Sequence, residues 1–433
     1  MTTVDRADPV RLAAQQRRDL AAYLTGEVHP FSPTEARRLD ASGIGPRGFR
    51  QVGDLAALPP VALDDVDGIG AVLRPTPEGL DRSSLRWRWL GARLRAGRGR
   101  FVDDVVDPRY RAIHFDDHDG TVVASTATDL DRLGELGRRW LEHAGVVATD
   151  AVVSVLPARA DLAFWQLTLG CRRGGVPALH LGESATADLV ASYAPTVLAG
   201  TGATLRKLAK RGADLDSVRL LLVVVDPLDH RARAALAKRY PRASQRLAWA
   251  PPGVRALWPE CEGGALHTFP DTELIEVVDQ RGRPVASGDG EILWTPIGWR
   301  GTVILRLSTS RYGHLVEGPC QSCGRTTARL ELGPPPPAPP PDPVLDGLEE
   351  ALAGVLAGEA LVADWTAEHR SGRNGGPPRL TVRLAPVRGA RAQLEECIGD
   401  LGRELGADRI VVERPSAVQR RITASGGRRV VHA

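Results

Sequence analysis

Apolar positions along the middle of the chain follow two spacings in turn, and their order predicts alternating strands and helices. Between Thr121 and Val225, short runs of valine, leucine and alanine are separated by longer segments with apolar residues at helical spacing. The predicted strands are Thr121–Ala124, Ala151–Leu156, Pro177–Leu181, Thr196–Ala199 and Leu220–Val225, and the predicted helices are Asp129–Ala144, Leu162–Gly170 and Glu183–Tyr193. This alternation is typical of a doubly wound α/β sheet.

The segments on either side of this region have different patterns. Residues 1–120 are helix-rich, and Ser32-Pro33-Thr34-Glu35 has the form of a helix start in which Ser32 or Thr34 accepts backbone amides. Between Glu273 and Leu332 the runs ELIEVVD, GEILWTPI, TVILRLS and RYGHLVEG are short and bounded by turns, so this part is predicted to be all-β.

A proline-rich segment separates this β-rich part from the C-terminal region. Gly333–Pro343 contains eight prolines in eleven residues, which favours a semi-rigid polyproline II conformation. It is either a plain spacer or a docking ligand for a proline-binding domain. Beyond it, helix 344–356, strands 361–369 and 380–384, helix 390–405 and strand 409–413 predict a ferredoxin-like α+β lid.

These patterns divide the chain into five parts. The predicted parts are a helical segment (1–120), an α/β core (121–260), a β-rich subdomain (261–332), a proline-rich linker (333–343) and a C-terminal α+β domain (344–433). A length of 433 residues agrees with two or three domains, since one compact core rarely serves so long a chain.

Composition narrows the class of protein. The chain is 42% hydrophobic and 25% charged, as is usual for a soluble globular protein, and its net charge of +3 is too small to indicate a nucleic-acid partner. No stretch reaches the roughly 18 apolar residues of a membrane helix, and the first residues carry no secretory signal pattern. Five cysteines without such a signal indicate a reducing compartment, so we expect a cytoplasmic protein without a membrane partner.

Three stretches resemble the phenylacetate–coenzyme A ligase branch of the adenylate-forming (acyl-CoA synthetase, AMP-binding) superfamily. They are HPFSPTEARRLDASGIGPRGFRQVGDLAALPPVALDDV at 29–66, GGALHTFPDTELIEVVD at 263–279 with GEILWTP at 290–296, and EGPCQSCGRTTARL at 317–330. The resemblance implies a large ligase domain with a small mobile C-terminal domain. Family members adenylate a carboxylic acid with ATP and magnesium and transfer the acyl group to coenzyme A.

The positions that match the family's ATP-handling motifs hold unsuitable residues. The phosphate loop S-G-T-T-G-x-P is matched by His114–Gly120, where three aspartates would repel a polyphosphate. The magnesium glutamate is matched by Pro252, and the ribose aspartate by Arg311. The hinge G-R-x-D-D is replaced by the proline-rich linker.

The family's C-terminal lysine is missing as well. That lysine offsets charge at the forming acyl-phosphate bond. The lysines of this chain are Lys207, Lys210 and Lys238, so none lies in the matching segment Thr423–Val430. Arg428 is a poor replacement, because a planar guanidinium does not substitute for a compact ammonium. With all five features changed, we assign no catalytic and no cofactor-binding residue.

A cysteine and histidine set predicts a structural zinc site. Cys261-x5-His267 and Cys320-x2-Cys323 supply three thiols and one imidazole, the ligand set of a closed tetrahedral zinc site, and some family relatives bear zinc here. The other interpretation is a leftover turn with a separate buried cysteine and a surface histidine. The remaining cysteines, Cys171 and Cys397, lie on apolar helical stretches and are predicted to be core residues.

Three further groups of residues allow two interpretations each. An acid-binding pocket or simple core packing would explain Asp161, Phe164, Trp165, Trp249 and Trp258. A metal site or a solvated loop would explain His114, Asp116, Asp117 and His118, and a solvated face or a phosphate site would explain Arg420, Arg421, Arg428 and Arg429.

The sequence thus predicts a pseudoenzyme: a ligase homologue that acts as a binding or partner subunit in acyl or aryl acid metabolism. Its expected partners are a carboxylic acid or acyl ligand and a partner ligase or carrier protein. The alternative is an active but atypical acid–CoA ligase or acyl-transferring enzyme, and only then would ATP, magnesium and coenzyme A bind.

Overall fold

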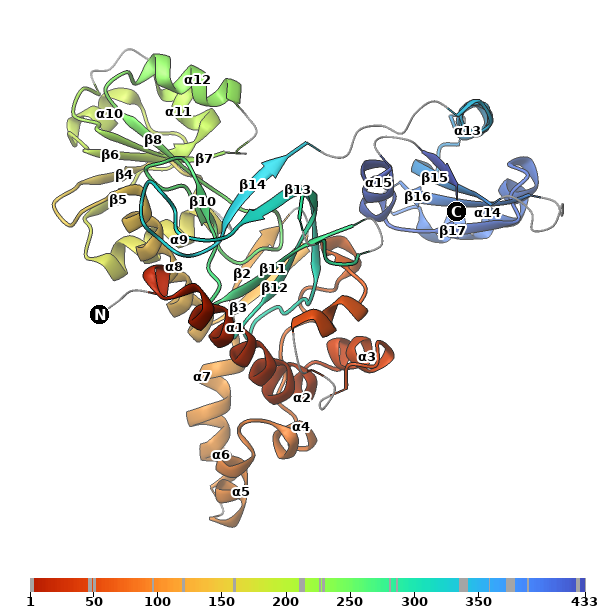
Figure 1. Ribbon diagram of the computed structural model, residues 1–433, viewed down its shortest axis with the longest axis horizontal. Coiled ribbons are helices and arrows are strands. Elements are labelled where there is room, and N and C mark those ends of the chain that lie inside the picture. The colour runs from red at the N-terminus through yellow and green to blue at the C-terminus, as the bar shows by residue number, and fades with distance from the viewer. Residues whose placement is uncertain are drawn as a thin grey trace. The chain divides into compact units, whose positions relative to one another are not determined.

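The structure is a computed structural model that forms two compact units. It describes residues 4–432 except 46–48, 50, 51, 96, 119, 120, 159, 160, 210–214, 226, 228, 229, 280, 281, 286, 335–341, 358, 371–377, 388 and 426–428. The first unit comprises Met1–Thr309 and Gly313–Gly333, and the second comprises Ser310–Tyr312 and Pro334–Ala433 (Figure 1).

A doubly wound sheet lies in the first unit, as predicted. Its strands run in the order β5-β4-β6-β7-β8-β9, with β4 to β8 all parallel and β9 antiparallel at the edge. The bounds are β4 Val152–Ser154, β5 Ala178–His180, β6 Val197–Thr201, β7 Leu220–Val224, β8 Ser244–Trp249 and β9 Trp258–Pro259. Strands β8 and β9 and helices α11 Gly202–Ala209 and α12 His230–Arg239 were not predicted. The predicted strand Thr121–Ala124 exists but does not belong to this sheet, because β3 Thr121–Thr126 pairs only with β2 Ala112–His118 among the described residues.

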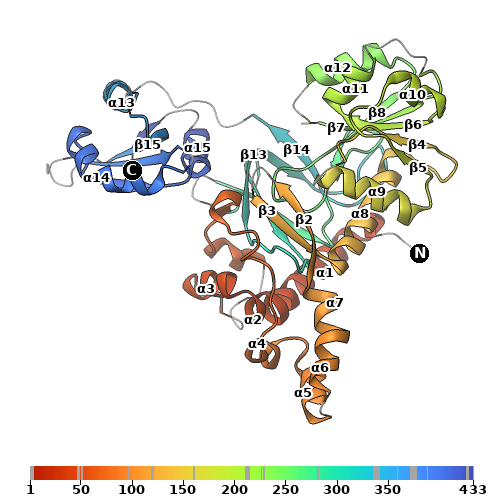
Figure 2. The ribbon, with the colours of Figure 1, turned by 180° about the vertical axis from the view of Figure 1, so that it is seen from behind.

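Helices cover both faces of this sheet (Figure 2). They are α8 Ala127–Ala144, α9 Leu162–Gly174, α10 Ala187–Ser192, α11 Gly202–Ala209 and α12 His230–Arg239. Successive strand residues point to opposite faces of the sheet, and each face has its own apolar core. Val152 packs with Trp140 of α8 and Leu167 of α9 on one face, whereas Val153 packs with Leu205 of α11 on the other. Burial on both faces explains why the central strands β4, β6 and β7 are mostly apolar.

A second sheet forms the β-rich part. Strands β10-β14-β13-β12-β11 follow one another, and β1 pairs with β13. The bounds are β1 Val61–Ala62, β10 Leu266–His267, β11 Glu273–Val278, β12 Gly290–Pro296, β13 Leu307–Val316 and β14 Arg329–Gly333.

One prediction in this sheet was wrong. The runs TVILRLS and RYGHLVEG are not two strands, because the segment before Leu307 is a turn and one strand, β13, spans both runs. Arg306 in this turn has a φ of 52°, and its buried guanidinium donates to Glu276 Oε2 at 3.0 Å and to the Gly282 carbonyl at 2.7 Å. The apolar residues before it indicated burial but not conformation.

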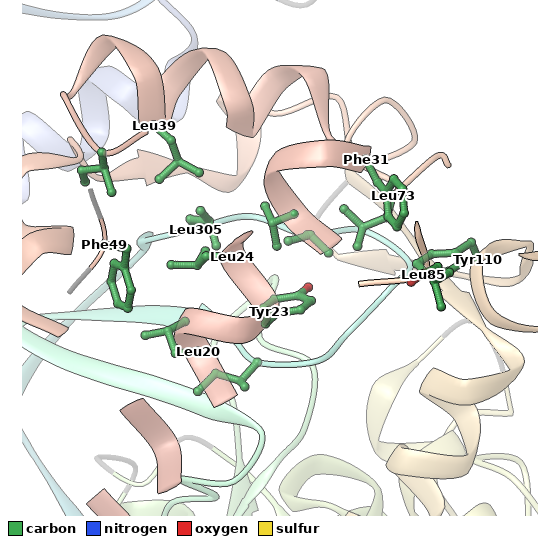
Figure 3. Packing of buried hydrophobic residues seen from close by; sticks show 14 of the residues in the cluster. Leu20, Tyr23, Leu24, Phe31, Leu39, Phe49, Leu73, Leu85, Tyr110 and Leu305 are labelled. Carbon is green, nitrogen blue, oxygen red and sulfur yellow. The ribbon is translucent and has the colours of Figure 1, made fainter. Parts of the chain in front are cut away.

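The N-terminal helices pack around an apolar cluster that also includes Leu274, Ile297, Val303 and Leu305 of the β-rich part. The elements are α1 Pro9–Tyr23, α2 His29–Phe31, α3 Pro33–Ala41, α4 Pro77–Arg82, α5 Arg86–Leu94, α6 Arg98–Phe101 and α7 Asp107–Tyr110, followed by the hairpin β2 Ala112–His118 and β3 Thr121–Thr126. Figure 3 shows Leu20, Tyr23 and Leu24 facing this cluster. The predicted helix start is confirmed, since Ser32 Oγ accepts the Glu35 amide at 3.3 Å.

The second unit has its own sheet, in the order β17-β16-β15-β18. Its elements are α13 Pro343–Leu356, β15 Val362–Arg370, β16 Arg379–Pro386, α14 Arg391–Glu404, β17 Arg409–Val412, α15 Pro415–Ala424 and β18 Val430–His432. The predicted order helix, strand, strand, helix, strand is confirmed, while α15 and β18 were missed. The ferredoxin-like description stays a prediction, and most of the proline-rich linker lies outside the described residues.

Among the described residues, no helix is long and apolar enough to cross a membrane.

Candidate functional site

The four predicted zinc ligands lie on two tight turns and one strand. The first turn follows β9: the Cys261 amide donates to the Ala265 carbonyl and the Gly264 amide donates to the Cys261 carbonyl, both at 2.9 Å. Gly264 has a φ of 81°, a conformation that favours glycine. The chain then reverses into β10, where His267 lies.

The second turn contains the other two thiols. The Cys320 amide donates to the Arg325 carbonyl and the Gly324 amide donates to the Cys320 carbonyl, both at 2.8 Å. Strands β10 and β14 are antiparallel neighbours with His267 opposite Arg329. This pairing brings the two turns together although they are far apart in the sequence.

The geometry of the four ligand atoms fits a tetrahedral zinc site. All four lie within 4.8 Å of one another. The Sγ atoms of Cys261 and Cys320 are 4.0 Å apart, and Cys323 Sγ is 3.4 Å from His267 Nε2. Zn–S bonds of about 2.3 Å at tetrahedral angles place two sulfurs about 3.8 Å apart, so only small adjustments are needed. The donor set is that of a structural zinc site, and Cys261 and His267 are fully buried.

A threonine that the sequence did not single out orients the imidazole. The hydroxyl of Thr327 is 3.0 Å from His267 Nδ1, and both side chains are fully buried. A proton on Nδ1, donated to this hydroxyl, leaves the Nε2 lone pair directed at the thiols, as a metal ligand requires. Burial lowers the pKa of His267 to about 3, which keeps the ring neutral.

The thiols differ in their surroundings. Burial raises the pKa of Cys261 to about 11. Burial also opposes ionisation of Cys320, but the amides of Cys323 and Ser322 donate to its sulfur and hold its pKa below the ordinary value. Backbone amides aimed at a cysteine sulfur favour the thiolate, which is the form that binds zinc.

The N-terminal segment is attached to the second turn. The Thr326 amide donates to the Asp5 carbonyl at 2.8 Å, and the buried Asp5 carboxylate pairs with Arg139 and lies 3.3 Å from His143 Nε2. The ring of His143 meets that of His267 edge-on, with centroids 5.3 Å apart. Burial raises the pKa of Asp5, but His143 and Arg139 outweigh it and hold that pKa far below the usual range. No sequence signal marks this network.

The described residues of the segment that matches the phosphate loop, 114–118, lie in β2, which pairs with β3. Within it, His114 Nε2 is 2.9 Å from Asp116 Oδ1, and the buried His118 Nδ1 accepts the Gly253 amide at 3.0 Å. Gly253 directly follows Pro252, the position matching the magnesium glutamate. The two segments that the resemblance matches to the phosphate loop and to the magnesium glutamate are therefore hydrogen-bonded to each other.

The segment that matches the ribose aspartate lies in β13. The hydroxyl of Ser308 donates to Glu291, and that of Thr309 donates to the Ile292 carbonyl at 2.6 Å. These hydroxyls stabilise pairing with the neighbouring strand, and a guanidinium at Arg311 cannot accept hydrogen bonds from ribose hydroxyls.

The remaining predicted candidates make contacts within the protein. Asp161 is the N-cap of α9, because its Oδ1 accepts the Ala163 amide at 2.8 Å. Trp249 and Trp258 pack against each other in the core, and Trp165 packs edge-on against Phe164 and His114. Cys171 is buried, which raises its pKa to about 12, and Cys397 packs in the core of the second unit.

The arginines near the C-terminus are in ion pairs where the structure describes their side chains. Arg421 lies 3.2 Å from Glu413, and Arg429 pairs with Asp364. The side chain of Arg420 and all of Arg428 lie outside the described residues. The paired arginines agree with the solvated-face interpretation.

Comparisons with known proteins identify the fold. No protein family and no curated protein matches the chain by sequence. Among solved structures, a 2-hydroxyisobutyryl-CoA ligase with its acyl-AMP and CoA in the thioesterification state matches with a TM-score of 0.57 at 14% identity, covering 98% of this chain and 89% of that one. Its open conformation with the same ligands gives a TM-score of 0.56 at 16% identity, covering 98% and 91%.

These matches confirm the predicted fold of the adenylate-forming superfamily over nearly the whole chain. They do not single out the phenylacetate–CoA ligase branch, which stays a prediction.

Proposed function

We propose that this chain is a binding or partner subunit in acyl or aryl acid metabolism, which has the fold of an acid–CoA ligase and no longer adenylates. Its β-rich part is held together by a structural zinc ion on Cys261, His267, Cys320 and Cys323. The natural ligand in this proposal is a carboxylic acid or acyl group, and the protein partner is a ligase or a carrier protein.

The hydrogen bond from Gly253 to His118 carries the proposal. Burial, with Arg255 nearby, lowers the pKa of His118 to about 4, so the ring is neutral and its Nδ1 can accept the amide proton. The amide is thus satisfied by protein, and the hairpin is tied to the segment that would carry a magnesium ligand.

Charge in the same region also disfavours a triphosphate. On the described part of the hairpin, the exposed carboxylate of Asp117 would repel phosphate oxygens, whereas Asp116 is buried beside His114. The guanidinium of Arg255 is directed at protein instead, because it donates to the Ala124 carbonyl at 2.9 Å and to Ser125. Downstream of Lys238 the sequence has no lysine to offset charge on an acyl phosphate.

The zinc would have a structural role. Four protein ligands complete a tetrahedral coordination sphere and leave no position for water or substrate. The site would join the turn between β9 and β10, which leads from the doubly wound sheet into the β-rich part, to the turn before β14.

One observation supports the alternative, an active but atypical acid–CoA ligase. The matched ligase structures hold an acyl-AMP and CoA, and the match includes the C-terminal unit. This alternative requires ATP and magnesium to bind in a way that the residues on the hairpin do not explain.

Measuring pyrophosphate release distinguishes the proposed function from the active-ligase alternative. With ATP, magnesium, coenzyme A and arylacetic, benzoic or fatty acids, we expect no release above the blank, and calorimetry with ATP and magnesium should show no binding heat. Turnover that is abolished by His118→Ala would contradict the proposal, because a contaminating ligase would not respond to that substitution.

A further inference from the structure

A stretch in the helical part of the first unit is strongly basic. Between Ser83 and Val102 the sequence contains no aspartate or glutamate. It contains six arginines, Arg86, Arg88, Arg93, Arg95, Arg98 and Arg100. Neither the zinc site nor the ligase fold accounts for this run.

Helix α5 in this stretch has apolar residues on two opposite sides. One side faces the protein: Trp89 is 3% exposed and Ala92 is 8% exposed. The other side faces solvent, where Trp87 is 70%, Leu90 is 42% and Leu94 is 79% exposed. With 3.6 residues per turn, these three side chains lie within about 60° of one another around the helix axis. A helix packed against its own domain on one side normally has a polar outer side.

Arginines border the exposed apolar side on both flanks. At about 100° per residue, Arg86 and Arg93 fall on one flank, and Arg88 and Arg95 fall on the other. Two of these arginines form loose, exposed ion pairs: Arg93 is 3.6 Å from Asp81 and Arg100 is 3.8 Å from Asp104, with all four side chains more than half exposed. Trp87 lies beside the Arg86 guanidinium, which is 5.2 Å from the ring centroid.

The position of α5 leaves this side accessible within its unit. Figures 1 and 2 both show α5 and α6 at the end of a helical arm that extends away from the two sheets of the first unit. The exposed apolar side chains therefore lie at a protruding end, where a broad surface can reach them.

We propose that α5 is an interfacial anchor that binds the surface of an anionic phospholipid bilayer. Trp87, Leu90 and Leu94 would enter the boundary between headgroups and acyl chains, while the flanking arginines would contact lipid phosphates. A helix that lies in the interface differs from one that spans the membrane. The expectation of no membrane partner rested on the lack of a spanning segment and did not address such a helix.

The geometry favours lipid over an acidic protein. A convex tip with a tryptophan and two leucines would need a matching apolar groove in a protein partner, whereas a bilayer surface adapts to it. Arginines on both flanks match a surface that is anionic in every direction, and tryptophan is enriched at membrane interfaces.

Vesicle flotation of the full chain tests the proposal. Vesicles of phosphatidylcholine with phosphatidylglycerol should bind the protein at low salt and release it as salt rises, and vesicles of phosphatidylcholine alone should bind it far less. Trp87→Ser with Leu94→Ser should lower the affinity at least tenfold, and Arg86→Gln with Arg88→Gln should lower it by about fivefold for each arginine.

A matched variant on the same unit provides the control. Leu189→Ser with Arg231→Gln and Arg239→Gln removes one exposed leucine and two exposed arginines from α10 and α12 and should bind as wild type does. Because all substituted side chains are exposed, the melting temperatures should be unchanged.

Three outcomes would overturn the proposal. One is equal failure to bind both kinds of vesicle. Another is equal loss in the control variant, which indicates nonspecific charge attraction. The third is a wild-type oligomer that dissociates in Trp87→Ser with Leu94→Ser without vesicle binding, which assigns the exposed side of α5 to contacts between copies of this chain.

Discussion

Single side chains in this protein are oriented by partners that lie far away along the chain. His267 faces the thiols because Thr327 occupies its other nitrogen, and the second turn is anchored by Asp5, more than 300 residues upstream. Each of these contacts buries a polar group that needs its partner. Single substitutions here should therefore have large and separable effects.

At Cys320, replacement by serine should remove the metal. Wild-type protein should contain one zinc per chain, whereas Cys320→Ser should contain almost none and should be destabilised by about 4 kcal/mol, the scale of loss of a structural metal. Because binding releases thiol protons, zinc affinity should fall as pH falls. Elemental analysis and thermal unfolding measure both effects.

The control for this substitution is Cys171→Ala, a buried thiol in the core of the α/β sheet. It should leave the zinc content at one per chain. A well-folded wild-type protein without stoichiometric metal would support the leftover-turn interpretation instead.

His118 should make stability depend on pH. Its pKa is about 4 in the fold and about 6.5 in the unfolded chain, so the unfolded state binds a proton first as pH falls. Stability is therefore complete above about pH 6.5 and is lost toward pH 4, with about 2 kcal/mol lost between pH 7 and 5. His118→Asn keeps an acceptor for Gly253 and should show a shallower loss in urea unfolding.

The exposed His230 provides the comparison. His230→Asn should reproduce the wild-type pH dependence. If the free energies of unfolding of wild type and His118→Asn fall in parallel as pH falls, then His118 is not buried in its neutral form.

At the scale of elements, two helices approach closely because each contributes a glycine. A Cβ at Gly137 of α8 would lie 2.1 Å from the Gln166 carbonyl oxygen, and one at Gly170 of α9 would lie 2.5 Å from the Gly137 carbonyl carbon. These are backbone atoms that cannot move alone. The close crossing sets the position of α9 and with it the buried contacts of Trp140 and Leu167.

We therefore expect Gly137→Ala to lower the free energy of unfolding by about 2 kcal/mol or more, since the helices must separate. Gly399→Ala on the exposed side of α14 is the matched change, because nothing lies within 4 Å of its added Cβ. It should stabilise by about 0.5–1 kcal/mol through helix propensity. Equal effects at both positions in denaturant unfolding would show that the crossing is not tight.

At the scale of the whole molecule, the chain is built from units with separate cores. The core of the second unit includes Leu345, Trp365, Val382, Leu394 and Val430, which come from its helices and strands alone. A unit with its own core can fold independently.

A fragment of residues 342–433 should therefore fold. We expect native-like circular dichroism and a cooperative thermal transition, and a fragment of residues 1–333 should bind zinc with the stoichiometry of the full chain. A fragment 342–433 that stays unfolded while the full chain is stable would show that its core depends on the rest of the protein.

Local patterns determined much of this protein. Period-two and period-3.6 spacing act within a few residues, so the strands between Thr121 and Val225, the helices α8, α9 and α10, and most of the second unit were predictable, although α11 was missed. The two halves of the candidate zinc site were also predictable, because the spacings Cys261-x5-His267 and Cys320-x2-Cys323 are local, whereas the pairing of β10 with β14 brings the two halves together.

Only the tertiary structure decided the rest, because those features depend on residues distant in sequence. The turn at Arg306 forms because its buried guanidinium finds acceptors near Glu276 and Gly282, and no local pattern encodes that. The contact of His118 with Gly253 and the outward apolar side of α5 likewise depend on which surfaces the fold covers. The sequence shows which side chains are apolar and which of them share one side of a helix or strand. Three-dimensional packing determines which of those sides are buried.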